Sequence, residues 1–196
     1  NSVRPVLQTI GLDKDVNTLA GLYILNTKRG PLFLADTTVN LNPNAAQIAE
    51  ITQNVAKTIR KLKITPRIAL LSYSNFGSSP GDDAEKMGKA ATILHETNPS
   101  LVVDGEVQAN FALNSDLMNE KFPFSTLANK DVNTLIFPNL SSGNIAYKLL
   151  QQMTDGDAIG PILIGLKKAI HVVQLGSSVR EIVNMVKIAV IDAQNK

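Results

Sequence analysis

The stretch HVVQLGSSVREI, residues 171–182, combines a small-residue turn with the start of a helical pattern. The tripeptide Gly176-Ser177-Ser178 follows an apolar run, and Glu181 lies three residues after its last serine, which is the spacing of a capping box. Backbone N–H groups at such a helix start are unpaired and carry partial positive charge, which suits an anion. The two residues before this turn carry no charge: they are Gln174 and Leu175. The stretch therefore predicts either an anion-binding turn or a site that has lost its charged partners.

Two further loops combine small hydroxyl residues with glycine between an expected strand and an expected helix. They cover residues 72–79 and 138–144. Backbone without bulky side chains lets a ligand approach closely, although the same residue types also simply form turns and caps. If the three loops share the carboxyl edge of one sheet, they form a binding site there. Its candidate residues are Ser72, Ser74, Asn75, Gly77, Ser78, Ser141, Ser142, Gly143, Asn144, Gly176, Ser177 and Ser178.

Common nucleotide-binding motifs are absent from the sequence. It contains no GxxxxGK[ST] and no GxGxxG after an expected strand, and neither histidine sits in a recognisable triad motif. His95 ends an expected helix, where an imidazole commonly meets the last carbonyls, and His171 begins an expected strand, where packing is its expected role. The segment Asp104-Gly105-Glu106 either brings carboxylates to the site or forms a solvated strand-end turn. Spacing alone therefore predicts no catalytic residue.

Composition and charge narrow the class of protein. The 196 residues are 44% hydrophobic and 18% charged, as in a globular domain, and the net charge is only +2. No basic run stands out beyond one helix face, so no nucleic-acid partner is predicted. Without cysteine, and with only two histidines, a metal cluster is not expected. No apolar run reaches membrane-spanning length and no secretory signal opens the chain, so we expect a cytoplasmic setting and no membrane partner.

Apolar runs alternate with helical patterns along the chain. Strands are expected at residues 19–26, 32–35, 67–73, 101–107, 134–137 and 170–174, and helices at 44–62, 82–95, 144–153 and 179–194, with a short helix at 111–119. For the helix at 44–62 we expect Asn42 as N-cap and Pro43 as the first helical residue. Asp155-Gly156-Asp157 and Gly160-Pro161 predict turns. This alternation indicates an α/β fold with a mostly parallel or mixed sheet and flanking helices.

The order of these loops and runs resembles the phosphate acetyl/butyryl transferase family. The segments that carry the resemblance are LLSYSNFGSS, VVDGEVQANFAL, NTLIFPNLSSGNIAYKLLQ, AIGPILIGLKK and QLGSSVREIVNMVKIAVIDAQ, and the opening SVRPVLQTIG is similar to a family segment of the type LRPALQ. Together they cover essentially the whole chain. RIALLSYSNFGSS and LGSSVREIVNM are similar to the version fused behind the catalytic domains of bacterial NADP-dependent malic enzymes. The resemblance implies a phosphotransacetylase-like architecture, of the isocitrate and isopropylmalate dehydrogenase type.

The resemblance also implies which positions matter. Active family members move an acetyl group between coenzyme A and phosphate in a cleft between two α/β lobes. A Ser-Arg pair serves the transition state and the phosphate, and an aspartate acts as base toward the thiol. The matching positions hold Gln174, Leu175 and Glu181. The family usually has lysine where Phe76 stands and aspartate where Asn110 stands, whereas Arg4 matches a family arginine that faces the cleft.

The missing cations decide the expected chemistry. Attack of a thiolate on an acyl phosphate builds negative charge that needs a cation or several aimed donors, and removing one such donor commonly lowers the rate on the order of 100- to 1,000-fold. Leu175 and Phe76 are apolar at both positions. We therefore expect no catalytic residue and treat Gln174, Leu175 and Glu181 as degenerate catalytic positions. Arg4 and the backbone of residues 176–178 remain available for a phosphate-bearing ligand.

Three functions follow as alternatives. The first is a noncatalytic regulatory and oligomerisation domain of an NADP-dependent malic enzyme, with acetyl coenzyme A or a related acyl thioester as effector. The second is an active phosphate acetyltransferase, and the third is a purely structural domain. The first implies that upstream malic enzyme domains hold NADP and a divalent metal, and that this chain itself has no cofactor.

The expected domain plan is one phosphotransacetylase-like unit over residues 1–196, as a fragment of a longer chain. Residues 20–165 form the main lobe in this plan, and residues 1–19 and 170–196 belong to a second lobe. The last helix, residues 179–194, carries apolar residues on more than one face, which indicates burial within the chain or at a subunit interface. The resemblance to dimeric transferases favours a homodimer or a higher homo-oligomer.

Overall fold

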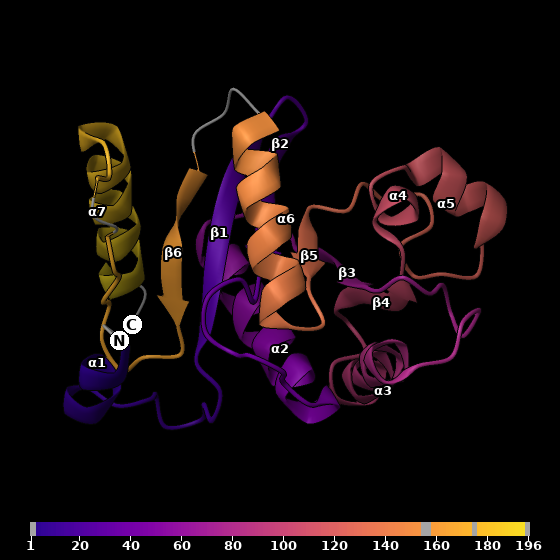
Figure 1. Cartoon of the computed structure of the whole chain (residues 1–196), viewed down its shortest axis with the longest axis horizontal. Helices are drawn as coiled ribbons and strands as arrows, with labels where there is room; N and C mark the ends of the chain where they lie inside the picture. The colour runs from indigo at the N-terminus through magenta and orange to yellow at the C-terminus, as the bar shows by residue number, and fades with distance from the viewer. Residues whose placement is uncertain (1–2, 154–157, 174–175, 195–196) are drawn as a thin grey trace.

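The computed structural model describes residues 3–153, 158–173 and 176–194 (Figure 1). Its strands are β1 (Ala20–Thr27), β2 (Gly30–Ala35), β3 (Arg67–Leu71), β4 (Val102–Val107), β5 (Thr134–Ile136) and β6 (Ala158–Ile164). Its helices are α1 (Val3–Thr9), α2 (Ala45–Lys61), α3 (Asp82–Thr97), α4 (Ala109–Ala112), α5 (Ser115–Lys121), α6 (Leu140–Met153) and α7 (Val179–Gln194). Strands and helices alternate along most of the chain, which confirms the predicted α/β class.

The strands form one mixed sheet with the order β4-β3-β5-β2-β1-β6. Four neighbouring strands run parallel to one another, in the order β4-β3-β5-β2. Strand β1 pairs antiparallel with both β2 and β6. Parallel strands end at the same edge of a sheet, so the segments that follow β2, β3 and β5 lie at a common edge. We call these three segments, residues 36–40, 72–79 and 139–144, the loop edge.

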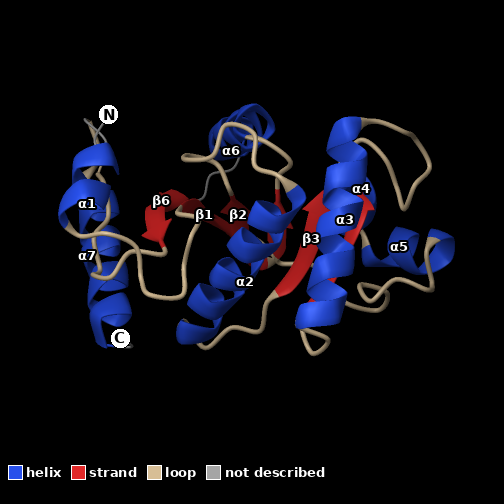
Figure 2. Cartoon of the chain, turned by 90° about the horizontal axis from the view of Figure 1, so that it is seen from below, coloured by secondary structure: helices blue, strands red, loops and turns tan. Residues whose placement is uncertain are grey.

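Helices cover both faces of the sheet and divide the core into two main layers. On one face, α2, α3 and Met185 of α7 pack against side chains such as Phe33 and Ile68. On the other face, α4, α5 and α6 pack against Leu34 and Leu135. Figure 2 shows α6 on one side of the strands and α2 and α3 on the other. The near-continuous apolar runs of β1 and β3 follow from this double cover.

Helix α2 begins two residues later than the sequence predicts. Its N-cap is Asn44, whose side chain accepts a hydrogen bond from the Gln47 backbone N–H at 2.9 Å, and Gln47 Oε1 accepts from the Asn44 backbone N–H at 2.9 Å. This reciprocal capping box explains the correction, because Asn42 has no glutamine or glutamate three residues further on. The apolar stripe Ile48, Ile51, Val55 and Ile59 is buried as predicted.

Strand β6 was not predicted, because Gly160-Pro161 indicates a turn. The structure places both residues inside the strand, with a register irregularity in β1 between Leu22 and Ile24. Proline removes a backbone donor, which an edge strand tolerates, and β6 is the last strand of the sheet. The other predicted turn, Asp155-Gly156-Asp157, lies outside the described residues.

The predicted strand at residues 170–174 is wrong for the part that is described. Residues 170–173 have no strand partner; Ile170 and Val172 instead pack in a small cluster with Leu19, Leu163 and Leu166. Helix α1 was not predicted, α6 begins at Leu140 instead of residue 144, and the single helix expected at 111–119 is two short helices. Short apolar runs look alike in strands and in packed loops, so periodicity could not separate them.

Candidate functional site

The loop after β3 is organised by a buried carboxylate from β4. Glu106 is 5% exposed, and its Oε1 accepts hydrogen bonds from Ser74 Oγ at 2.9 Å and from the Gly77 backbone N–H at 2.7 Å. Ser74 is fully buried and also accepts from the Ser79 backbone N–H at 3.0 Å. The predicted site residues Gly77 and Ser78 are exposed. The Ser78 backbone N–H donates to the Asn75 carbonyl at 3.0 Å, so the backbone N–H groups of both residues are used within the protein. The loop therefore has a fixed interior.

The loop after β5 continues directly into α6. Asn139 caps the helix: its Oδ1 accepts from the Ser142 backbone N–H at 3.0 Å, and its carbonyl accepts from Ser142 Oγ at 2.9 Å. Ser141 is exposed, and Asn144 Nδ2 donates to the Thr37 carbonyl at 3.2 Å. The predicted residues 141–144 therefore lie in the first turn of a helix and touch the segment after β2.

The segment after β2 contains a residue that the sequence analysis missed. Asp36 is buried, and its carboxylate accepts from the backbone N–H groups of Gly21, Thr38, Val39 and Asn40 at 2.8–3.1 Å and from Asn40 Nδ2 at 2.5 Å. A Cβ atom on Gly143 would lie 2.4 Å from the Asp36 carbonyl oxygen, so α6 can approach only because this residue is glycine. The signal in the sequence was a polar run directly after an apolar strand.

One cation does lie at the loop edge. Lys86 of α3 has a side chain that is 13% exposed, and its Nζ is 2.7 Å from Asp83 Oδ1 and 2.7 Å from Asn42 Oδ1. The other Asp83 oxygen accepts from Asn139 Nδ2 at 3.0 Å. The network ties α3 to the segments after β2 and β5. Because Asp83 already pairs with Lys86, the lysine offers little uncompensated charge to an anion.

Position 76 presents an aromatic ring to other aromatic rings. Phe76 has a φ of 49°, and its ring centroid lies 5.0 Å from that of Phe122 and 5.1 Å from that of Phe124. Phe111 extends the cluster through Phe122 at 5.0 Å. The side chain at this position therefore packs against the α4–α5 region.

The third predicted loop is separate from the first two. Ser178 N–H donates to Glu181 Oε2 at 2.6 Å and Glu181 N–H donates to Ser178 Oγ at 3.2 Å, so the predicted capping box is confirmed. Figure 1 shows the start of α7 near the end of the sheet where β6 begins, away from the loop edge. Gln174 and Leu175 lie outside the described residues, and Arg4 belongs to α1 with its side chain outside the described part.

The Glu181 carboxylate interacts electrostatically with Tyr23, which belongs to a stacked pair of tyrosines. The rings of Tyr23 in β1 and Tyr147 in α6 stack with centroids 3.9 Å apart. Burial raises the pKa of the Tyr23 hydroxyl, and the Tyr147 hydrogen bond and the Glu181 carboxylate raise it further. Tyr23 is therefore neutral at any physiological pH and contributes packing and a hydrogen bond.

The remaining titratable candidates have structural partners. His95 Nε2 lies 2.9 Å from the Val103 carbonyl, so it meets β4 and not the last carbonyls of α3. Asp104 is buried and accepts from Ser125 Oγ and the Thr126 backbone N–H, both at 2.8 Å. His171 Nδ1 accepts from the Leu163 backbone N–H at 3.2 Å. Of the two acids in the segment Asp104-Gly105-Glu106, only Glu106 contacts the loop edge.

Two absences concern only the described part of the chain. No helix there is long and apolar enough to span a membrane. Across residues 3–153, 158–173 and 176–194, no group of three or more histidine, aspartate and glutamate residues is arranged to hold a metal ion.

The sheet order and its loop edge define a phosphotransacetylase-like α/β unit, and comparisons with known proteins agree. A phosphotransacetylase structure from Streptococcus pyogenes superposes with a TM-score of 0.93 at 36% identity, covering 100% of this chain and 60% of that one. The model of the phosphate acetyl/butaryl transferase family matches residues 1–190. The chain therefore belongs to this family, as its resemblance predicted.

Relatives within the family fall into two kinds. An NADP-dependent malic enzyme of Haemophilus influenzae is 43% identical over 187 residues, which are 95% of this chain and 25% of that protein. A phosphate acetyltransferase of Clostridium acetobutylicum is 38% identical over 199 residues, which are 98% of this chain and 60% of that protein. The chain thus spans a quarter of the malic enzyme that it matches.

Proposed function

We propose that this chain is a noncatalytic regulatory and assembly domain of an NADP-dependent malic enzyme, with the loop edge as an effector site for acetyl coenzyme A. Malate oxidation, with NADP and a divalent metal, then belongs to domains upstream. The relatives that share 40–43% identity over a quarter of a malic enzyme support the assignment. An effector site needs shape and donors, but not the cations that acyl transfer requires.

The observation that carries the proposal is the environment of Phe76. The family pattern expects a lysine here, but the ring packs against Phe122 and Phe124. The other charged groups of the loop edge are engaged as well, since Lys86 pairs with Asp83 and Glu106 binds its own loop. An acyl phosphate would therefore meet few free charges at this edge. The exposed Ser141, in the first turn of α6, is suited to bind a coenzyme A ester without converting it.

An active phosphate acetyltransferase is the alternative, and one observation favours it. The fold matches the Streptococcus pyogenes phosphotransacetylase closely, and relatives named phosphate acetyltransferase are 34–38% identical over nearly the whole chain. Coenzyme A-dependent turnover of acetyl phosphate distinguishes the two functions. We expect no turnover above background under conditions in which the Streptococcus enzyme is active, and rapid formation of acetyl coenzyme A would reject the regulatory proposal.

Effector binding is tested by calorimetry with acetyl coenzyme A. Ser141→Glu adds a negative charge at the exposed start of α6, and we expect it to weaken binding by about tenfold or more through repulsion of the phosphates. Ser100→Glu is the matched control, because Ser100 is an exposed serine in the turn before β4, at the opposite edge of the sheet. Absence of binding heat with the unmodified chain would favour the purely structural alternative.

We further propose that the domain takes part in assembly through α7, with residues 1–19 and 170–196 in a second lobe. Val179, Val183, Val186 and Val190 recur at three- and four-residue spacing and are 43–79% exposed together with Ile182. Such a stripe is typical of a helix that packs against a further surface. Sedimentation of the unmodified chain and of Val186→Asp tests this role: we expect a dimer or higher oligomer that the variant weakens, and a monomer in both would contradict it.

A further inference from the structure

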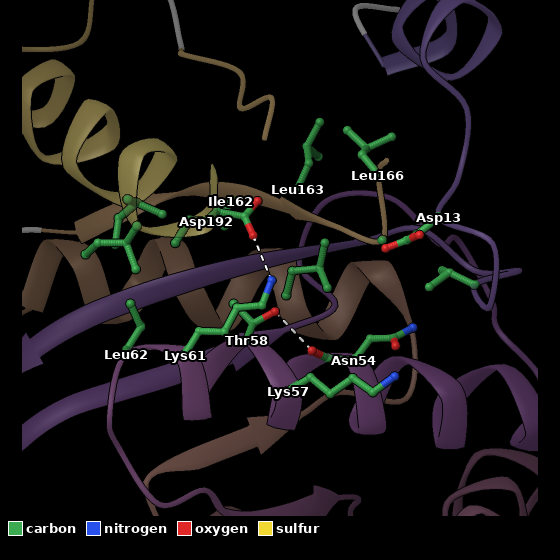
Figure 3. A pocket seen from close by; sticks show the side chains of 15 residues that line it. Asp13, Asn54, Lys57, Thr58, Lys61, Leu62, Ile162, Leu163, Leu166 and Asp192 are labelled. Atoms are coloured by element: carbon green, nitrogen blue, oxygen red, sulfur yellow. Dashed lines mark hydrogen bonds and ion pairs between the residues drawn. The ribbon is translucent and has the colours of Figure 1, made fainter. Parts of the chain in front are cut away.

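A cavity of about 110 Å³ lies between α2, β6 and α7 (Figure 3). None of its lining residues belongs to the loop edge. Its apolar residues include Val16 before β1, Leu62 at the C-cap of α2, Ile162 and Ile164 of β6, Leu166 after β6, and Ile188 and Ile191 of α7. Its polar groups lie mainly on α2, with Asp13 from the segment before β1 and Asp192 from α7. The cavity is therefore amphipathic.

Asn54 supplies an unsatisfied donor to this cavity. The residue is 7% exposed, and its Nδ2 is buried with no hydrogen-bond partner within the described part of the chain. A buried amide N–H without a partner costs free energy, so an acceptor atom bound beside it would be stabilised. Lys57 lies one helical turn further along α2, and Figure 3 shows both side chains extending toward the same end of the cavity.

The charges around the cavity determine what that acceptor should be. Lys61 Nζ pairs with Asp192 Oδ1 at 3.0 Å, which neutralises both groups. Lys57 is exposed and makes no ion pair or hydrogen bond that involves the described residues. Asp13 Oδ1 accepts from the Lys14 backbone N–H at 2.8 Å. One free cation and one amide donor suit an anion, and the nearby aspartate disfavours more than one negative charge.

From this arrangement we propose that the cavity binds a short-chain monocarboxylate. Its carboxylate oxygen accepts from Asn54 Nδ2 and faces the Lys57 ammonium, and its alkyl part contacts Val16, Ile164 and Leu166. The size fits a ligand of about four to six non-hydrogen atoms, since a 150 Å³ cavity can hold benzene. The inference is independent of the effector site at the loop edge, because the two share no residue.

Amide-detected NMR titration of the 196-residue chain with propionate tests the proposal. We expect saturable shifts of the Asn54 side-chain amide and of the Leu166 backbone amide, with a Kd on the order of millimolar for so small a ligand. Propionamide lacks the charge and inorganic phosphate lacks the alkyl group, so each should bind at least about fivefold more weakly. No saturable shift with propionate, or equal binding of phosphate, would overturn the proposal.

Variants assign the binding to the two named side chains. Asn54→Leu removes the donor at similar volume and should weaken propionate binding about tenfold, and Lys57→Gln should weaken it about threefold. Arg60→Gln is the matched control, because Arg60 is an exposed cation of the same helix that does not line the cavity. If Asn54→Leu does not fold, Val16→Phe provides a second test, since the larger ring should fill this end of the cavity and abolish binding. Unchanged affinity in Lys57→Gln together with unchanged affinity in either Asn54→Leu or Val16→Phe would reject the assignment.

Discussion

The loop edge and the cavity between α2 and α7 use similar residues in opposite ways. At the loop edge, the Asp36 and Glu106 carboxylates accept hydrogen bonds from nearby N–H and O–H groups, and Lys86 forms an ion pair with Asp83. In the cavity, Asn54 Nδ2 is buried with no partner in the described chain. Most buried polar groups of the loop edge are therefore used to build its loops, which leaves exposed groups such as Ser141 for a ligand, whereas in the cavity a single buried amide is left without a partner. The environment of each group, and not its residue type, separates the two regions.

The largest expected effect concerns Asp36, on which the loop edge depends. Asp36→Ala leaves four backbone N–H groups without their acceptor, one of them buried and three part-buried. We expect a loss of about 3–4 kcal/mol in the free energy of unfolding, because unpaired buried donors cost about 1–3 kcal/mol each before relaxation. Urea unfolding measures it, and Asp15→Ala, at an exposed acid, should stay within about 0.5 kcal/mol of the unmodified chain. A loss below about 1 kcal/mol for Asp36→Ala would show that water reaches these donors.

Phe76→Lys tests whether the loop edge lacks activity because it lacks a cation at this position. The substitution removes the ring contacts with Phe122 and Phe124 and brings a charge to an apolar cluster. We expect the free energy of unfolding to fall by about 1–2 kcal/mol, with no gain in acetyl phosphate turnover. Thermal unfolding and the coenzyme A assay check the two parts. A clear gain in turnover would mean that this side chain can leave the cluster and reach a substrate.

The Lys61–Asp192 ion pair sharpens the view of the cavity. Its side chains are 30% and 21% exposed, and it joins the ends of α2 and α7. A double-mutant cycle with Lys61→Gln and Asp192→Asn should give a coupling of about 0.5–1 kcal/mol in urea unfolding. The matched pair Lys89–Glu85, at 3.4 Å and 69% and 60% exposed, should give about 0.3 kcal/mol or less. Equal couplings would indicate that burial beside the cavity does not strengthen the pair.

Glu50 provides the smallest effect, and it depends on pH. Burial raises the pKa of its carboxyl, but hydrogen bonds from Thr18 and Asn17 outweigh burial and leave the pKa below its ordinary value of 4.5. A lowered folded-state pKa adds stability above the unfolded-state pKa, and this stability is lost as the pH falls through the folded-state pKa. The gap in urea midpoint between the unmodified chain and Glu50→Gln should therefore be present at pH 7 and nearly closed at pH 3. A gap that does not change with pH would contradict the assignment.

Most of the fold follows from local patterns in the sequence. The apolar stripe of α2 and the continuous apolar runs of β1 and β3 reflect burial directly, so these elements lie within two residues of the predicted bounds. Strand β6 was not predicted because it contains Pro161. A proline is tolerated there because β6 lies at the edge of the sheet, which the sequence alone does not show. The strand expected at residues 170–174 failed for the opposite reason, since residues 170–173 are apolar but face no partner strand.

The site was less accessible to sequence reasoning. The Ser178–Glu181 capping box is a local interaction and was predicted from spacing alone. Asp36, Lys86 and Asn54 depend on contacts between distant segments, such as the 2.7 Å contact between Lys86 and Asn42. No spacing rule connects residues that far apart, and whether an amide is satisfied is decided by its neighbours in space.

The outer side of β6, which pairs with no other strand, offers few free backbone N–H groups. Leu163 directs its backbone N–H outward, where His171 Nδ1 receives it at 3.2 Å. Pro161, two residues earlier on the same side of the strand, has no N–H to offer. A strand from another molecule would find almost no hydrogen-bonding partner along this side. The β6 edge of the sheet is thereby protected from pairing with a strand of another copy.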